Sequence, residues 1–262
     1  MSADRILALR AQRRAVLEFC RGLTADQWQT PSRASGWLVR DVIAHMGASC
    51  RVIWSRQVVD VLQSADTERD NEALVQNRRT WPINQVIGEF ARWSRVTAAA
   101  MNLAARGPMN TMTVRSGSLG RYPAWLLPST LVFDWHVHLW HDIAPAVDKP
   151  APPTDARRLT ATLEWMLAGL EQMNRDKMGW VDRPLTLSLA GPGGGTWTVA
   201  PAGDGLLRVT PGRCDAAAAT VAGESIDFPA WATARTPWRT VDLGITGDDL
   251  FASRFLDAVN II

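Results

Sequence analysis

The chain has 262 residues, of which 47% are hydrophobic and 21% are charged. This length and apolar content favour two packed domains and make disorder unexpected. The 28 basic and 26 acidic residues leave a net charge of +2, which offers no strong field to a phosphate backbone, so nucleic acid is not an expected partner. The amphipathic first segment lacks the apolar core of a signal peptide, and no run approaches eighteen apolar residues, so no membrane association is expected.

The first 144 residues carry apolar side chains at mixed three- and four-residue spacing, which is typical of amphipathic helices. Helices of that length, joined by turn signals, predict an antiparallel, up-down four-helix bundle. The segment between the last two helices, 106–119, is rich in Gly, Ser and Thr and is predicted to be a long loop or a short hairpin covering one end of the bundle. The four predicted helices lie near residues 3–23, 37–64, 82–106 and 122–144.

Proline is dense from Pro145 to Ala156, PAVDKPAPPTDA, and hydrophobic periodicity stops there. This composition predicts a semi-rigid linker and a boundary between two domains, residues 1–147 and 148–262. After the boundary, the patterns of a helix, several short strands and two short helices predict a small α+β domain. These elements are predicted at 156–176 (helix), 185–189, 196–199, 206–210, 218–221 and 241–245 (strands), and 225–234 and 248–259 (helices).

The predicted fourth helix contains three of the four histidines and two aspartates within LVFDWHVHLWHDIA, residues 131–144. On a regular helix, Asp134, His141 and Asp142 fall within about 60° of His138, whereas His136 lies roughly 200° away. Carboxylate oxygens and imidazole nitrogens on one face suit a borderline metal such as zinc. The alternative is a core helix with satisfied histidines, or a polar stripe on a solvated face.

The fourth histidine, His45, lies one turn beyond Asp41 on the predicted second helix. A lone histidine there is more often structural, but metal sites in four-helix bundles are built from inward-facing side chains on different helices. His45, together with Asp134 and His138, would supply three protein ligands and leave a fourth position open. An open position is typical of a catalytic zinc rather than a structural one.

Trp28, the segment PSRASGWLVRDVIAHM (residues 31–46) and a carboxylate followed four residues later by a histidine resemble the DinB-type bundle of the mycothiol-dependent maleylpyruvate isomerase family. The segments DAAAATVAGESIDFPAWATAR and DLGITGDDLFASRFLDAVNII are similar to that family's small sterol-carrier-like domain. The resemblance covers nearly the whole chain. It implies an α+β protein in which a DinB-like up-down four-helix bundle precedes a small C-terminal sterol-carrier-like α+β domain.

By this resemblance, the metal ligands are His45, Asp134 and His138. The family usually has glutamate where this chain has Asp134, and the shorter aspartate would need closer helices or an intervening water. The family commonly has aspartate where this chain has His141, with Asp142 displaced by one position. Either residue could orient a ligand, or one could replace Asp134 as a ligand.

Two residues are predicted to act on the substrate. Arg235, in WATARTPW, matches a family arginine that faces the metal site, and it is expected to hold a substrate carboxylate in a bidentate clamp. Its alternative role is that of a cation at a helix C-terminus, which the macrodipole favours. His141 is expected to act as an acid or a base. Trp135 and Trp140 flank the cluster and could line an aromatic cavity, although burial in the core is the commoner role of tryptophan.

The predicted function is a mycothiol-dependent S-transferase, in which zinc or another divalent metal holds the thiol as a thiolate for attack on a small electrophile. Maleylpyruvate cis-trans isomerisation with the same thiol is one alternative, and a non-catalytic metal- or ligand-binding protein is another. Cys20, Cys50 and Cys214 form no CxxC pair, which favours a reducing cytoplasm. The expected partners are the thiol and the electrophile, and the expected state is a monomer or a homodimer.

Overall fold

The computed structural model describes residues 2–104, 107 and 112–262. It divides the chain into two compact units, Met1–Pro153 and Thr154–Ile262. The division falls inside the proline-rich segment, at Pro153 rather than at the predicted residue 147. The first unit is helical and the second contains a sheet, so the predicted α+β fold with an N-terminal helical bundle is confirmed. Within the described residues, no helix is both long enough and apolar enough to cross a membrane.

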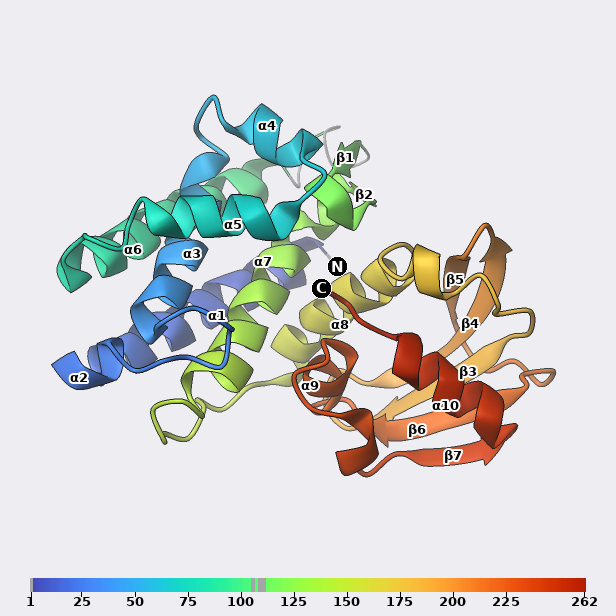
Figure 1. Ribbon diagram of the computed structural model, residues 1–262. Helices are drawn as coiled ribbons and strands as arrows, with labels where there is room; N and C mark the ends of the chain where they lie inside the picture. Colours follow the sequence, from blue (N-terminus) through green and yellow to red (C-terminus); the bar gives the residue numbers. More distant parts are fainter. Residues whose placement is uncertain (1, 105–106, 108–111) are drawn as a thin grey trace. The chain divides into compact units, whose positions relative to one another are not determined.

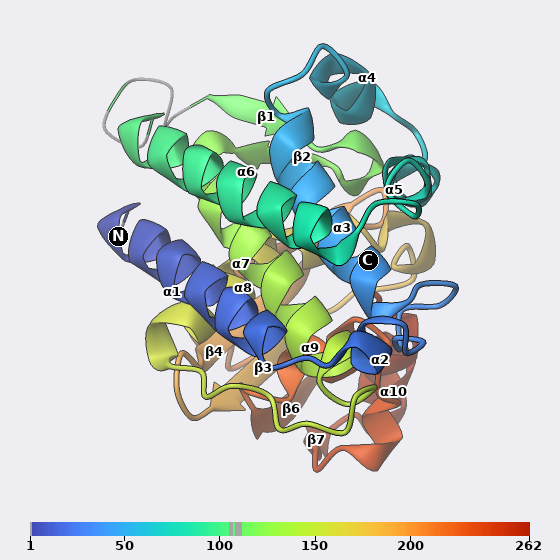
Figure 2. The ribbon, with the colours of Figure 1, turned by 90° about the vertical axis from the view of Figure 1, so that its left-hand side faces the viewer.

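The first unit is built around four long helices (Figures 1 and 2). The third packs along the second, and the first packs against the third and the fourth. Their facing sides are apolar, with Leu9, Ile43, Phe90 and Trp135 among the fully buried side chains. Burial of these faces drives the assembly, since isolated helices of this length are marginal in water. The helices are α1 (Ser2–Arg21), α3 (Val39–Val52), α6 (Ile83–Ala104) and α7 (Leu127–Val137).

The predicted second helix, 37–64, is wrong beyond Val52, where α3 ends. The chain then leaves the bundle through α4 (Val58–Gln63) and α5 (Thr67–Gln76) before α6 begins. We call residues 53–82 the excursion. Helix α5 begins where the Asp66 carboxylate accepts a hydrogen bond from a backbone N–H of the first turn, which is a common N-cap arrangement. The excursion is therefore a polar insertion between two core helices rather than a continuation of one.

A short hairpin precedes α7. Strand β1 (Thr113–Arg115) pairs antiparallel with β2 (Arg121–Pro123), with Val114 opposite Tyr122. The predicted loop or hairpin at 106–119 thus contains the first of these strands, whereas its residues 106 and 108–111 lie outside the described residues. The short helix α2 (Ala25–Trp28) follows α1 and begins with a capping box between Thr24 and Gln27.

The second unit contains a five-stranded sheet of order β5-β4-β3-β6-β7. The central strand β3 runs parallel to β6 and antiparallel to β4, and the two outer pairings are antiparallel. Leu185, Leu187 and Leu189 of β3 are buried, as expected for a central strand. The strands are β3 (Leu185–Ala190), β4 (Gly195–Gly203), β5 (Leu206–Pro211), β6 (Ala219–Glu224) and β7 (Gly244–Gly247).

Helices cover this sheet. The α8 helix packs against β5, and α10 packs against β6 and β7. The predicted helix at 156–176 is shorter in the structure, ending at Leu170, and the predicted strand at 241–245 lies three residues later, as β7. Each main helix starts with an aspartate N-cap, Asp155 for α8 and Asp248 for α10. The helices are α8 (Ala156–Leu170), α9 (Phe228–Ala232) and α10 (Asp249–Ala258).

Candidate metal centre

Helix α3 fixes the position of His45. The helix starts where the Asp41 carboxylate accepts a hydrogen bond from the Leu38 backbone N–H at 3.0 Å. Val42, Ile43 and Met46 are completely buried around this turn, so the helix cannot rotate without exposing apolar surface. His45 lies one turn after Asp41 and is itself buried. Its imidazole is therefore directed by the packing of the whole helix.

Helix α7 presents the other two candidate ligands. Asp134 and His138 are four residues apart and share one face of the helix, as the sequence pattern predicted. Their side chains are partly exposed, 24% for Asp134 and 12% for His138. The neighbouring Trp135 is fully buried and packs edge-on against Phe90 of α6, with ring centres 5.1 Å apart. This anchor turns the Asp134 and His138 face toward α3.

The three side chains converge on one point. Asp134 Oδ1 lies 3.3 Å from His45 Nε2 and 3.5 Å from His138 Nε2, and one potential ligand atom from each residue lies within 4.8 Å of the others. Zinc–nitrogen and zinc–oxygen bonds of roughly 2.1 Å in a tetrahedron place neighbouring donors about 3.4 Å apart. The separations from Asp134 to each histidine therefore fit a tetrahedral ion, and Asp134 reaches both histidines directly without the longer side chain of glutamate.

The end of this helix departs from regular geometry. Residues His138–Ile143 form a π-helical turn, in which the Ala144 backbone N–H donates to the Leu139 carbonyl, five residues earlier, at 3.0 Å. A π turn has roughly 4.4 residues, so position i+4 stays above position i. Asp142 lies beside His138, on the shared face that the sequence predicted, with Oδ2 2.7 Å from Nδ1. The assumption of a regular α-helix through residue 144 is wrong for this turn.

The bond to Asp142 determines which nitrogen of His138 is available. With Nδ1–H donating to this buried carboxylate, the lone pair of Nε2 is directed toward Asp134. Two imidazole nitrogens and a carboxylate oxygen then face one another at a partly buried position. Either an imidazole N–H or a cation bound among them offsets the repulsion between their lone pairs. The donor set therefore fits a divalent ion with nitrogen and oxygen preference.

The remaining two histidines of the cluster contact each other. His136 is fully buried and stacks on Trp140, with ring centres 4.5 Å apart and planes inclined by 20°. His141 meets His136 edge-on at 6.0 Å. Trp135, which was expected to be able to line a cavity, is completely buried against Phe90 and cannot do so. The cluster thus divides into a ligand face and an aromatic stack.

The sequence comparison supports this architecture. The profile of the mycothiol maleylpyruvate isomerase N-terminal domain matches residues 9–144, which contain the whole triangle of donors. The chain belongs to this mycothiol maleylpyruvate isomerase family. The family predicted from the sequence is therefore confirmed. The comparison with curated proteins found no match.

Two solved structures resemble the chain over its length. One is the crystal structure of the mycothiol-dependent maleylpyruvate isomerase, with a TM-score of 0.56, and the other is a histidine-to-alanine mutant of that enzyme, with a TM-score of 0.55. Each is 15% identical in sequence, and each alignment covers 90% of both chains. At this identity the likeness establishes the shared fold, including a second unit after the family's N-terminal domain.

The predicted substrate-binding arginine lies in the second unit. Arg235 follows α9, where the backbone N–H groups of Arg235 and Thr236 both donate to the Ala230 carbonyl, at 3.0 and 3.1 Å. Ala234 just before it has a positive φ of 55°, an uncommon conformation for a residue with a Cβ. The end of this helix is thus a tightly closed turn, and Arg235 within it is half-buried. The role of Arg235 toward substrate stays a prediction.

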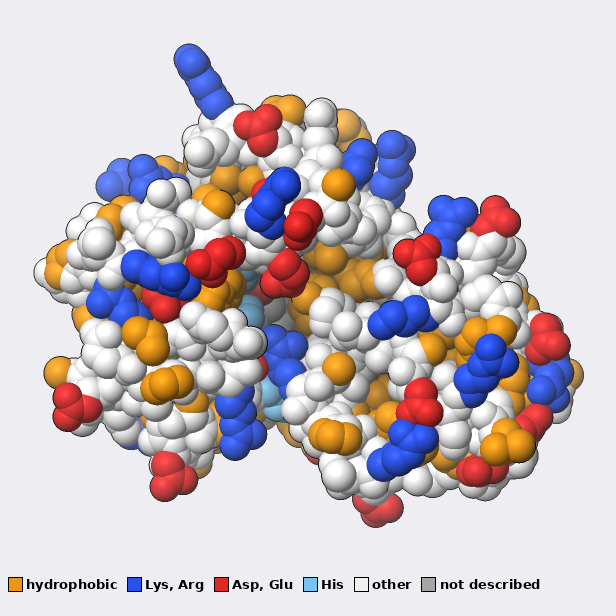
Figure 3. Space-filling model, in the orientation of Figure 1, with side chains coloured by type: hydrophobic (Ala, Val, Ile, Leu, Met, Phe, Trp, Pro, Cys, Tyr) orange, Lys and Arg blue, Asp and Glu red, His pale blue; other side chains and the backbone are white. Residues whose placement is uncertain are grey.

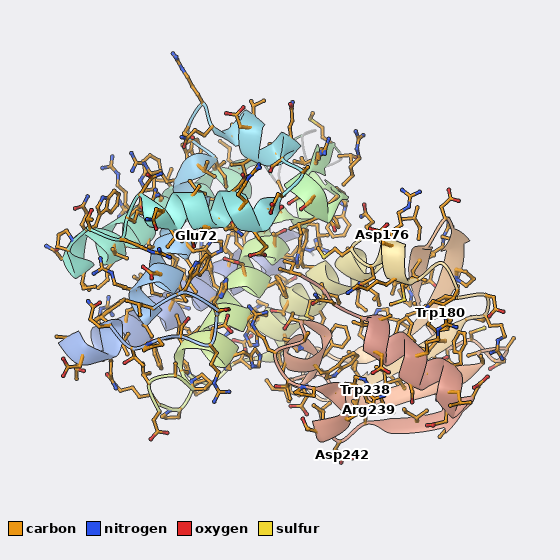
Figure 4. The ribbon with its side chains drawn as sticks, viewed as in Figure 1. Glu72, Asp176, Trp180, Trp238, Arg239 and Asp242 are labelled. Carbon is orange, nitrogen blue, oxygen red and sulfur yellow. The ribbon has the colours of Figure 1, made fainter. Side chains whose placement is uncertain are left out.

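The sequence did not identify one residue of the centre, Trp37. The indole of Trp37 lies over both ligand histidines, with ring centres 5.1 Å from His45 and 6.3 Å from His138. Its Nε1–H donates to Glu72 Oε2 at 2.8 Å, and Glu72 is on α5 (Figure 4). Histidine side chains reach the molecular surface beside acidic side chains in the space-filling view (Figure 3). Gly36, with a positive φ of 78°, precedes Trp37 and could have marked the turn, but no sequence pattern joins Trp37 to Glu72.

Proposed function

We propose that the bundle is the catalytic centre of a metal-dependent enzyme that uses a low-molecular-weight thiol, with mycothiol as that thiol. The observation that carries the proposal is the convergence of His45, His138 and Asp134, with Asp134 Oδ1 3.3 and 3.5 Å from the two Nε2 atoms. These residues would hold zinc or another divalent ion through three protein ligands. A zinc ion bound in this way stabilises the thiolate form of a thiol at neutral pH and leaves a position for it.

The chain's own residues would prepare the centre for this chemistry. Asp142 holds the His138 ring in one tautomer and one orientation through the 2.7 Å hydrogen bond, as outer partners of ligand histidines commonly do. The apolar packing of α3 and α7 keeps His45 and Asp134 in place without adjustment on binding. His141 is proposed as the acid or base that moves the substrate proton, and Arg235 as the clamp for a substrate carboxylate.

The main proposal is S-transfer to a small unsaturated electrophile. The thiolate sulfur forms a bond to the β-carbon of an α,β-unsaturated carbonyl compound, and the electron pair of the double bond moves toward the carbonyl oxygen. Protonation of the α-carbon then leaves a stable thioether. Arg235 would stabilise the negative charge that develops on the electrophile during the addition.

Maleylpyruvate isomerisation is the second candidate, and the family membership favours it. The same addition occurs, but rotation about the former double bond precedes breakage of the carbon–sulfur bond. The electron pair of that bond returns to the sulfur, so the thiol is regenerated and only the geometry of the substrate has changed. A non-catalytic metal-binding protein is the third reading, and it predicts a closed coordination sphere that takes no thiol.

The proposed compartment is the cytoplasm, and the proposed state is a monomer or a homodimer. All three cysteines are free thiols, which suits a reducing environment. None of them belongs to the donor triangle. Burial raises the pKa of the Cys20 thiol to about 12, and burial also raises the pKa of Cys50. These two thiols are therefore protonated at neutral pH and are poor candidates for the nucleophile.

One experiment tests the proposal and separates its readings. The purified protein is loaded with zinc and incubated with mycothiol and a panel of unsaturated acids, including maleylpyruvate, with mass detection of thioethers and chromatography of geometric isomers. Thioether formation supports transfer, and isomer exchange without thioether supports the isomerase. Neither product with any substrate, together with undiminished metal content in His45→Ala and His138→Ala, would reject the centre.

A further inference from the structure

The indole of Trp37 lies next to the two candidate ligand histidines, His45 and His138. The rings of Trp37, His45 and His138 form a compact triangle, with centre-to-centre distances of 5.1, 5.2 and 6.3 Å. The indole is tilted by 41° to one imidazole and by 34° to the other, so it is not stacked flat on either. Trp37 is only half-buried, although burial is the usual fate of so large an apolar ring. Trp37 is therefore partly exposed, and its ring lies next to the rings of His45 and His138.

The backbone of Trp37 is held rigidly. Its carbonyl accepts hydrogen bonds from both the backbone N–H and the hydroxyl of Ser32, each at 2.8 Å. Its own N–H donates to the Ala34 carbonyl at 3.1 Å. Gly36 supplies the positive φ, 78°, that this tight turn requires. These hydrogen bonds and the Gly36 conformation fix the backbone of Trp37.

The same turn is attached to the ligand-bearing helix. The Arg33 backbone N–H donates to the Asp142 carbonyl at 3.0 Å. Asp142 also orients His138 through its side chain. A single residue of the π turn therefore positions a ligand histidine with its carboxylate and the Trp37 turn with its carbonyl. The position of the indole relative to the donor atoms is set by these bonds rather than by chance packing.

The orientation of the ring about its own side-chain bonds is set by the excursion. Trp37 Nε1–H donates to Glu72 at 2.8 Å. The other Glu72 oxygen accepts from Arg79 Nη2 at 2.9 Å, and Arg79 also lies 3.9 Å from the buried Asp41 carboxylate. Glu72 is thus held between the indole and an arginine. These two contacts restrict the Glu72 side chain to one orientation.

From these contacts we propose that Trp37 is the specificity-determining wall of the centre and that Glu72 is a positioning residue for its indole. A group bound at the open coordination position then contacts the exposed part of the ring. Aromatic rings favour planar, polarisable surfaces in offset or edge contacts. The enzyme is accordingly expected to favour electrophiles that carry an aromatic or conjugated group next to the reacting centre over short aliphatic ones. This inference rests on the proposed metal centre.

The test uses two metal-directed probes that differ only beyond their binding group, acetohydroxamate and benzohydroxamate. The full chain is loaded with Co²⁺, and the dissociation constant of each probe is measured from the change in the cobalt absorption spectrum. We expect the unmodified protein to prefer benzohydroxamate, and Trp37→Ala to lower that preference about tenfold. The cobalt content and the spectrum without probe should not change.

Matched variants separate a local role from loss of folding. Trp54 is a half-exposed tryptophan of the same unit whose indole N–H also donates to a side chain, Thr97, at 3.0 Å. Trp54→Ala should leave the preference unchanged. Glu72→Ala should weaken the preference, and Glu68→Gln on the exposed side of α5 should have no effect.

The outcomes are distinguishable. A preference ratio that is the same in the unmodified protein and in Trp37→Ala, with both probes bound, overturns the inference and leaves the proposed function standing. Equal effects of Trp37→Ala and Trp54→Ala also overturn it, because they indicate general loosening of the bundle. If the unmodified protein binds no cobalt, or neither probe changes its spectrum, then both the metal centre and the inference fail.

Discussion

The helices that carry the candidate metal ligands and the excursion that carries Glu72 are held in place by different forces. Most residues of α3 are buried, including both neighbours of His45. The α4 helix has no buried residue, and α5 has one, Val75. Apolar burial therefore fixes the ligands, whereas the excursion depends on hydrogen bonds and ion pairs. The candidate metal ligands thus lie on helices held by apolar packing. Glu72, which is proposed to position Trp37, lies in a segment held by a few polar contacts that single substitutions can alter.

Substitution of Arg78 is expected to have the largest effect on stability. It forms a bidentate ion pair with Glu89 of α6, with one contact at 2.9 Å, and both side chains are almost fully buried. Glu89 also accepts a hydrogen bond from Arg51 Nη1 at 3.1 Å, so removing Arg78 leaves the buried carboxylate with one partly exposed partner. We expect Arg78→Met to lower the free energy of unfolding by about 3 kcal/mol, the lower end of the cost of breaking a buried ion pair, measured by urea denaturation. The exposed Arg69→Met, also in the excursion, should change it by less than about 0.5 kcal/mol.

Metal content of Arg78→Met then distinguishes the two regions. If apolar packing alone fixes the ligands, the folded variant should still bind one equivalent of zinc. Loss of zinc from folded protein would instead indicate that the excursion supports the ligand geometry. Apolar packing alone would then not fix the candidate ligands.

Asp134 is expected to give the next largest effect. Asp134→Asn keeps the size of the side chain but removes the charge that offsets a divalent cation. We expect zinc affinity to fall by at least about a hundredfold, equivalent to about 2.7 kcal/mol. Competition with a chromophoric chelator measures this loss. Asp134→Glu, which restores the residue usual in the family, should retain affinity within about tenfold, and an equal loss in both variants would argue against a direct ligand.

Asp142 should contribute less, because it acts through His138. Asp142→Asn still accepts a hydrogen bond from Nδ1–H but lacks the charge that strengthens it. Loss of such outer partners typically costs about ten- to a hundredfold in metal affinity. The result should be a weaker zinc complex with unchanged stoichiometry. If zinc stoichiometry instead fell as it should for His138→Ala, Asp142 would be a ligand itself.

The ligand helices were predictable from sequence, and the excursion was not. The helical face that joins Asp134 to His138 follows directly from their spacing of four residues. The meeting of His45 with Asp134, 89 residues apart, came from bundle geometry and family resemblance. The excursion offered a start signal at Asp66, but α5 buries so little apolar surface that no amphipathic pattern marks it. The π turn depends on hydrogen bonds five residues apart, for which the sequence has no periodic sign.

A polar link in the second unit provides the smallest expected effect. Asp257 accepts hydrogen bonds from Arg239 and from Trp238 Nε1 on the surface of α10 (Figure 4). The bond from Arg239, and then that from Trp238, lowers the pKa of Asp257 to about 2. Unlike the links of the excursion, this one joins elements that apolar burial already holds, since Phe255 and Leu256 of α10 are buried. Its removal should therefore leave the fold unchanged.

The sign of the pH effect follows from the lowered pKa. The folded state binds the Asp257 proton more weakly than the unfolded chain, whose pKa is about 3.9. The ion pair therefore stabilises the fold above about pH 4, and this contribution is lost as the pH falls toward 2. Urea midpoints of the unmodified protein and of Asp257→Asn should differ slightly at pH 6 and converge near pH 2. A difference that persists at pH 2, or a large one at pH 6, would mean that polar links support the second unit as they support the excursion.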